Sequence, residues 1–222
     1  MTACGFASDT SSIIHAVLLV EQMLTTGGGW QDQVGGLLGG IKVGRSKAKL
    51  PLRVTNETLV TSSRFYATFA DHLELVYTGQ PRLARNLLQN VIRNYYTKQQ
   101  VVVRNFHDIR ENAEQCAEAC KREDLKAIGH HINRCWCQKK LITSGCEQQK
   151  CAKIIAALAP YALGQALAGV GGGGFLYVLT TKPYTKEFIA SALSDEQGAQ
   201  NITVYNVEID KEGMVFRTAP VN

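Results

Sequence analysis

The chain has 222 residues, of which 45% are hydrophobic and 19% charged, a composition typical of a soluble globular protein with a substantial core. Its 24 Lys and Arg residues exceed its 19 Asp and Glu residues, but the charges are scattered, so no nucleic-acid patch is indicated. No apolar run approaches the roughly 18 residues of a membrane span, and the first residues lack the features of a secretory signal. We therefore expect a cytoplasmic protein.

The first third of the chain predicts one helix followed by short strands. Ser8, Asp9 or Thr10 can cap a helix whose apolar positions keep helical spacing as far as Leu24. Between Leu37 and Ser63 the residues favour two or three short strands, and a buried strand follows at 73–77.

The remainder is mostly helical and then returns to strands. Apolar spacing predicts helices over 83–95, 103–121 and 125–141, and a fourth from about Gly145 to about Gly164 with a break at Pro160. After a glycine-rich loop we expect a strand at 175–180, a helix at 186–193, an alternating segment at 202–208 and a last strand at 214–217. Strands and helices that segregate in blocks predict an α+β fold with a mostly antiparallel sheet.

Seven cysteines form no CxxC pair, and reduced, partly buried thiols are the favoured interpretation. A zinc site built from His130, His131, Cys135 and Cys137 is the alternative, although a CxC spacing suits few zinc sites.

The segment 27–36, GGGWQDQVGG, holds a single acid between two glycine clusters. Glycine lets the backbone approach a ligand and adopt φ values that other residues avoid, so Asp32 is a candidate for presentation to a small ligand. A tight surface turn is the alternative interpretation.

A second cluster, LAGVGGGGFLYVL at 167–179, predicts the order helix, glycine loop, strand. A Walker A loop has the opposite order and a GK[ST] ending, which is absent here. Successive N–H groups in such a loop can form a concave anion site. Alternatively, the glycines allow a helix to pack closely against a sheet.

Three segments together resemble the sugar-kinase branch of the GHMP kinase superfamily, and within it the fucokinase family. They are TTGGGWQDQVGGLLGGIKVGRSK at 25–47, HLELVYTGQPRLARNLLQNVIRNYY at 72–96 and GQALAGVGGGGFLYVL at 164–179. The resemblance implies ATP-dependent phosphorylation of the anomeric hydroxyl of a free hexose, with L-fucose or a similar hexose and ATP as partners and Mg²⁺ as cofactor.

On this resemblance Asp32 is the catalytic carboxylate, and Gly28, Gly29, Gln33 and Arg45 are candidate substrate-binding residues. Gln33 can instead hold the loop by a structural hydrogen bond, Arg85 rivals Arg45, and Trp30 either stacks on a sugar or fills the core. The phosphate loop comprises the glycines of the second cluster: Gly169, Gly171, Gly172, Gly173 and Gly174.

The family also carries a nucleotide loop of the form PxxxGLGSSS before the first helix, whereas this chain starts MTACGFASDTSS. We therefore expect a C-terminal fragment: a remnant of the first lobe over 1–65, without the Mg²⁺ ligands, and a GHMP kinase C-terminal domain over 66–222, an antiparallel sheet with helices packed on one side. The fragment alone is expected to be inactive and to self-associate. A related heptose or hexose kinase is one alternative, and a non-catalytic fragment that binds a sugar or a partner chain is another.

Overall fold

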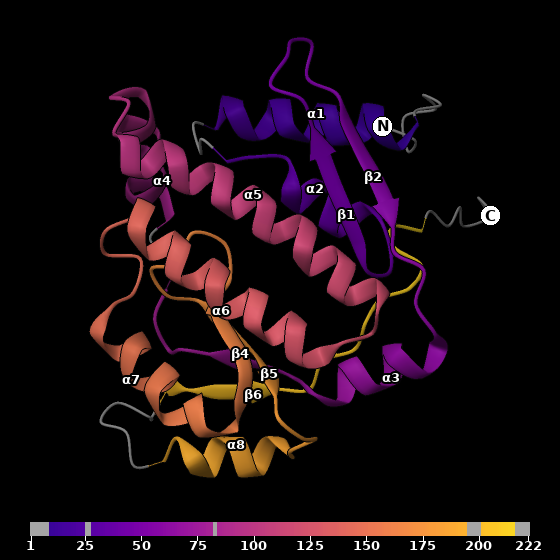
Figure 1. The fold of residues 1–222 in the computed structure, drawn as a ribbon, viewed down its shortest axis with the longest axis vertical. Coiled ribbons are helices and arrows are strands. Elements are labelled where there is room, and N and C mark those ends of the chain that lie inside the picture. Colours follow the sequence, from indigo (N-terminus) through magenta and orange to yellow (C-terminus); the bar gives the residue numbers. More distant parts are fainter. Residues whose placement is uncertain (1–8, 25–27, 82–83, 195–200, 216–222) are drawn as a thin grey trace, which may run out of the picture. The chain divides into compact units, whose positions relative to one another are not determined.

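The computed structural model describes residues 9–24, 28–81, 84–194 and 201–215 (Figure 1). Their contacts divide the chain into two compact units. The first contains the described residues up to Val60 and those from Ile209 onward, and the second runs from Thr61 to Glu208. The lobe boundary expected at residue 65 stays a prediction.

The first unit combines two helices with a β-hairpin. Helix α1 (Thr10–Met23) begins after Asp9, whose carboxylate accepts a hydrogen bond from the Ser12 N–H at 2.9 Å and confirms one of the proposed caps. Helix α2 (Gln31–Leu37) precedes strands β1 (Lys42–Ser46) and β2 (Val54–Thr58), which pair antiparallel. The described residues from Ile209 onward join this unit through an isolated antiparallel β-bridge between Leu38 and Gly213.

The second unit is a four-stranded antiparallel sheet with helices packed against it. The strand order is β4-β5-β3-β6, formed by β3 (Leu73–Tyr77), β4 (Ala162–Leu167), β5 (Phe175–Thr180) and β6 (Thr203–Tyr205). Its helices are α3 (Ser63–Asp71), α4 (Ala84–Tyr96), α5 (Gln100–Lys121), α6 (Leu125–Ile142), α7 (Gln149–Leu158) and α8 (Lys186–Ala192). Helices α5 and α6 run side by side (Figure 1).

Most expected elements are confirmed, including the α+β class and the strands at 73–77 and 175–180. The fourth helix is wrong in its second half. Helix α7 ends at Leu158, a short 3₁₀ turn follows, and 162–167 is strand β4, paired with β5. The glycine loop therefore joins two antiparallel strands. Of the last expected strand only Met214 and Val215 are described, and they lie outside the strands; the rest lies outside the described residues.

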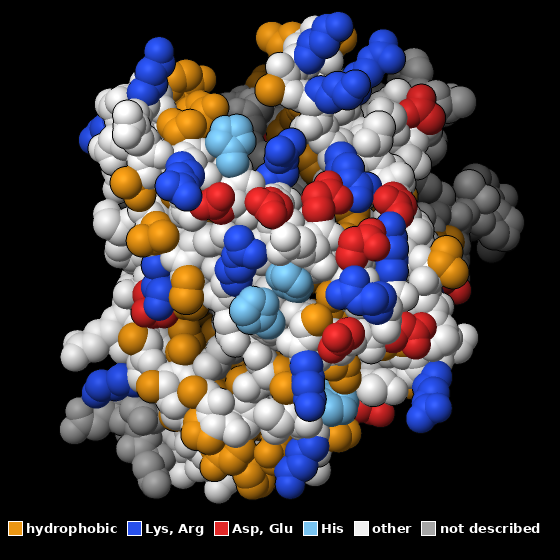
Figure 2. Space-filling view, in the orientation of Figure 1, with side chains coloured by type: hydrophobic (Ala, Val, Ile, Leu, Met, Phe, Trp, Pro, Cys, Tyr) orange, Lys and Arg blue, Asp and Glu red, His pale blue; other side chains and the backbone are white. Residues whose placement is uncertain are grey.

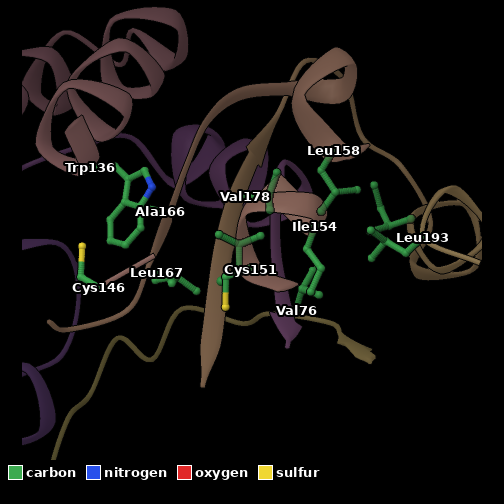
Figure 3. Close-up of a cluster of buried hydrophobic side chains, with 12 residues drawn as sticks. Val76, Trp136, Cys146, Cys151, Ile154, Leu158, Ala166, Leu167, Val178 and Leu193 are labelled. Carbon is green, nitrogen blue, oxygen red and sulfur yellow. The ribbon is translucent and has the colours of Figure 1, made fainter. Parts of the chain in front are cut away.

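The core of the second unit explains why β4 is a strand. Leu167 of β4 belongs to the same buried cluster as Leu158 of α7 and Val178 of β5 (Figure 3). At the edge of the sheet, Gly164 of β4 lies so close to the Gly129 backbone of α6 that neither position has room for a Cβ atom. Strand pairing and this close approach override the helix propensity of an Ala-rich segment.

Candidate active site

Asp32 lies in the first turn of α2, where its side chain is exposed. A carboxylate at this position is favourably placed relative to the partial positive charge of the helix start. The glycines around it do not act as expected, because Gly35 and Gly36 lie within the helix, and neither they nor Gly28 and Gly29 have positive φ. Asp32 is thus presented by a short helix and not by a strained loop.

Gln33, the next residue, is only 4% exposed. Neither its amide nitrogen nor its amide oxygen has a hydrogen-bond partner among the described residues. A buried amide without partners costs free energy, about 1–3 kcal/mol for such a group. The neighbour of the candidate base therefore carries a donor and an acceptor that are not used by the described part of the protein.

Trp30 anchors the start of α2 to strand β1. Its indole N–H donates to the Ser46 hydroxyl at 3.1 Å, and its ring covers Gly44 so closely that a Cβ there would lie 2.5 Å from a ring carbon. These contacts give Trp30 a packing role. They also hold the segment preceding Asp32 beside the strand that carries Arg45.

Arg45 is engaged within the hairpin. Its guanidinium forms an ion pair with Glu57 of β2 at 2.8 Å, and both side chains are partly exposed. In the β1–β2 register Glu57 lies opposite Val43, which makes it a diagonal neighbour of Arg45. The side chain of Arg85, the alternative candidate to Arg45, lies outside the described residues.

The remaining substrate-binding candidates of this unit are Gly28 and Gly29. The Gly28 carbonyl accepts a hydrogen bond from the Gln22 amide at 2.7 Å, whereas Gly29 is exposed and uncrowded. After α2, the Lys42 ammonium donates to the carbonyl of Leu38 and, at 3.2 Å, to that of Gly40. Burial lowers the pKa of Lys42, and the charge of Asp210 opposes this effect.

The glycine loop of the second unit depends on left-handed backbone. Gly169, Gly171, Gly172, Gly173 and Gly174 all have positive φ, between 65° and 123°. Gly171 is tightly packed, since a Cβ there would lie 2.6 Å from the Cys146 carbonyl oxygen and 3.1 Å from the Trp136 ring. Glycine is therefore required here for conformation and for space.

The hydrogen bonds of the loop leave some N–H groups unused. The N–H of Gly172 donates to the Cys146 carbonyl at 2.7 Å, and that of Gly174 donates to the Gln80 carbonyl at 2.8 Å. The N–H groups of Gly169, Val170, Gly171 and Gly173 donate to no other described residue. These four are the ones available to an anion, and the phosphate role of the loop stays a prediction.

Several residues that hold this loop were missed from the sequence. The Lys139 ammonium donates to the Gly169 carbonyl at 2.8 Å, and the Gln148 amide donates to that of Gly172 at 3.1 Å. The Thr78 N–H and hydroxyl both donate to the Gly174 carbonyl at 2.9 Å. These residues share no sequence signal, because they come from separate elements.

No other cofactor centre emerges from the described residues. They contain no group of three or more His, Cys, Asp or Glu side chains that could hold a metal ion, so no Mg²⁺ ligands are assigned. His131, of the alternative zinc set, is hydrogen-bonded through Nδ1 to the Asn112 side chain at 2.8 Å. Within the same ranges, no helix is both long and apolar enough to cross a membrane.

The comparisons with known proteins agree with the fold. Residues 116–200 match the family described as GHMP kinases C terminal. Over these residues the chain matches the C-terminal domain of GHMP kinases, which supports the superfamily expected from the sequence. A candidate sugar kinase from Campylobacter jejuni superposes with a TM-score of 0.65 at 22% identity, over 95% of this chain and 58% of that one.

Two curated relatives are similar in sequence. The chain is 31% identical over 192 residues to an L-fucokinase/L-fucose-1-P guanylyltransferase of Bacteroides fragilis, covering 86% of this chain and 20% of the relative. It is 30% identical over 198 residues to a bifunctional fucokinase/GDP-fucose pyrophosphorylase of Arabidopsis thaliana, covering 89% and 19%. The chain thus spans about a fifth of the length of these relatives.

Proposed function

We propose that this chain is part of an ATP-dependent sugar 1-kinase that converts L-fucose to fucose 1-phosphate. The observation that carries the proposal is the pair at the start of α2, an exposed Asp32 carboxylate followed by a buried Gln33 amide without described partners. Support for the class of substrate comes from the fucokinase activity in the names of both curated relatives.

Transfer of a phosphoryl group to a hydroxyl requires mainly positioning and charge stabilisation. In the proposed reaction the anomeric oxygen forms the new bond to the γ-phosphorus, the bond from that phosphorus to the bridging oxygen of ATP breaks, and ADP leaves. Asp32 accepts the hydroxyl proton, a contribution of about 10²–10⁴-fold in comparable enzymes. The Gln33 amide can donate to one sugar oxygen and accept from another hydroxyl.

In this proposal the unused N–H groups of the glycine loop bind phosphate oxygens. Residues with left-handed backbone can direct successive N–H groups toward one anion, and those of Gly169, Val170, Gly171 and Gly173 are unused by other described residues. Because the chain spans about a fifth of its curated relatives, we also propose that these 222 residues alone do not sustain turnover.

The test compares the longest natural polypeptide that carries this sequence with the 222-residue chain. Each is incubated with ATP, Mg²⁺ and one sugar from a panel of L-fucose, other hexoses and a heptose, and the product is identified by ³¹P NMR. We expect a phosphate on the anomeric carbon of L-fucose from the longer polypeptide, at about 1–100 turnovers per second.

Three outcomes would contradict parts of this proposal. Preferred transfer to another sugar would replace L-fucose as the substrate. A folded longer polypeptide that transfers no phosphate would contradict the kinase function and leave a non-catalytic binding role. Turnover by the 222 residues alone would contradict the proposed inactivity.

A further inference from the structure

The loop between β1 and β2 encloses a basic cavity of about 630 Å³. The described residues that line it include four cationic residues and no Asp or Glu. Figure 2 shows Lys and Arg side chains grouped over the end of this hairpin. We define the basic pocket by its lining residues, which are Arg45, Ser46, Lys47, Lys49, Leu50, Pro51, Arg53 and Thr55.

Three of the four cations have no anionic partner among the described residues. Arg45 is held by Glu57, but the side chains of Lys47, Lys49 and Arg53 make no hydrogen bond or ion pair with other described residues. Three like charges that line one cavity repel one another and raise the local potential, although salt screens this effect. An anion in the pocket would relieve this repulsion.

The base of the pocket is fixed before any ligand binds. Ser46 is held by the Trp30 indole, and the Thr55 hydroxyl donates to the Arg45 carbonyl at 3.3 Å. A tight turn brings the Lys49 N–H to the Lys47 carbonyl at 2.7 Å. Two cationic side chains therefore start from one turn on a paired hairpin, which lowers the entropic cost of binding.

The apolar residues of the lining indicate a small organic anion. Leu50 is 86% exposed, and together with Pro51 it offers an apolar surface beside the cations. The volume lies within the usual range of small-molecule sites, about 300–1,000 Å³. We propose that the basic pocket binds a phosphate-bearing small molecule, whose phosphate meets Lys47, Lys49 and Arg53 and whose organic part contacts Leu50.

The proposal does not depend on the kinase function, and its test measures binding only. Calorimetry on the full chain would use tripolyphosphate, ATP and L-fucose 1-phosphate as probes, which separates a bare phosphate, a nucleotide and a sugar phosphate as sources. The test variant is Lys47→Ala/Lys49→Ala. The matched control is Lys126→Ala/Lys153→Ala, which removes the same charge from two exposed sites in the second unit.

We expect at least one probe to bind the wild type and the control equally well, with an affinity that falls as salt rises. The test variant should bind about tenfold or more weakly, because two charge-assisted contacts are lost, and its far-UV circular dichroism should be unchanged. If the double variant unfolds, a second variant, Arg53→Gln, replaces it in the test and should weaken binding of the same probe.

Three results would overturn the proposal. The first is that no probe binds the folded wild type, and the second is that the test variant and the control bind the probe equally well. The third is that a single-stranded oligonucleotide, added as a further probe, binds and the small phosphates do not, because the pocket would then serve nucleic acid.

Discussion

Replacing Gly171 by alanine tests whether the glycine loop is a packed part of the second unit. At φ +86° an L-residue is strained, which costs about 1–3 kcal/mol. The added Cβ would also lie 2.6 Å from the Cys146 carbonyl oxygen. That oxygen cannot easily move, since it accepts the Gly172 N–H at 2.7 Å, so overpacking adds about 1–3 kcal/mol.

Gly145 provides a matched control for the backbone strain. Its φ is +80°, but a Cβ there would meet no atom within 4 Å. Gly145→Ala should therefore show the conformational cost alone, about 1–3 kcal/mol. The difference between the two variants, again about 1–3 kcal/mol, measures the packing around Gly171.

Urea unfolding followed by tryptophan fluorescence measures this difference. The chain has two tryptophans, so a Trp30→Phe background leaves Trp136, which is buried beside the loop, as the only reporter. If Gly171→Ala and Gly145→Ala lower the free energy of unfolding equally, the loop is not packed as described, and a purely ligand-binding role becomes the better explanation.

Two further predictions concern ionisation and association. Burial, with a smaller effect of the Glu187 charge, raises the pKa of Glu74, so its stabilising contribution is complete below the unfolded-state pKa and is lost as pH rises through the folded-state pKa. Glu74→Gln should therefore gain stability relative to wild type as the pH rises from about 4 to about 8, as measured by urea unfolding. If the difference in free energy of unfolding between the two proteins does not change with pH, the prediction is contradicted. The chain should also self-associate in sedimentation velocity, because Leu50 and Val60 are 86% and 90% exposed and a two-stranded sheet is marginal alone; a monomer at all concentrations would refute it.

Local signals in the sequence predicted the elements that depend on neighbouring residues. The cap at Asp9 and the apolar strands at 73–77 and 175–180 are examples. The strand at 162–167 could not be predicted in this way. Its small residues favour a helix locally, whereas the strand is stabilised by β5 and by the Gly129 backbone, which lies more than thirty residues earlier.

The candidate site, like the fold, could be predicted only in part from the sequence. A lone acid among glycines and amides marked Asp32, and the structure places it at the start of a helix. The burial of Gln33 and the pairing of Arg45 with Glu57 depend on packing and strand register, which local patterns do not determine. The lysine and glutamine that hold the glycine loop were missed for the same reason.

The central claim, that Asp32 is the catalytic carboxylate, is tested most directly by Asp32→Asn in the longest natural polypeptide that carries this sequence. Asparagine keeps the size of the side chain and much of its hydrogen bonding but cannot accept the proton, and Asp32 is exposed, so the fold should be unaffected. We predict that kcat for L-fucose falls by about 10²-fold or more, while the affinities for sugar and ATP change little. An unchanged kcat would contradict the claim and leave Asp32 with a structural role in the first turn of α2.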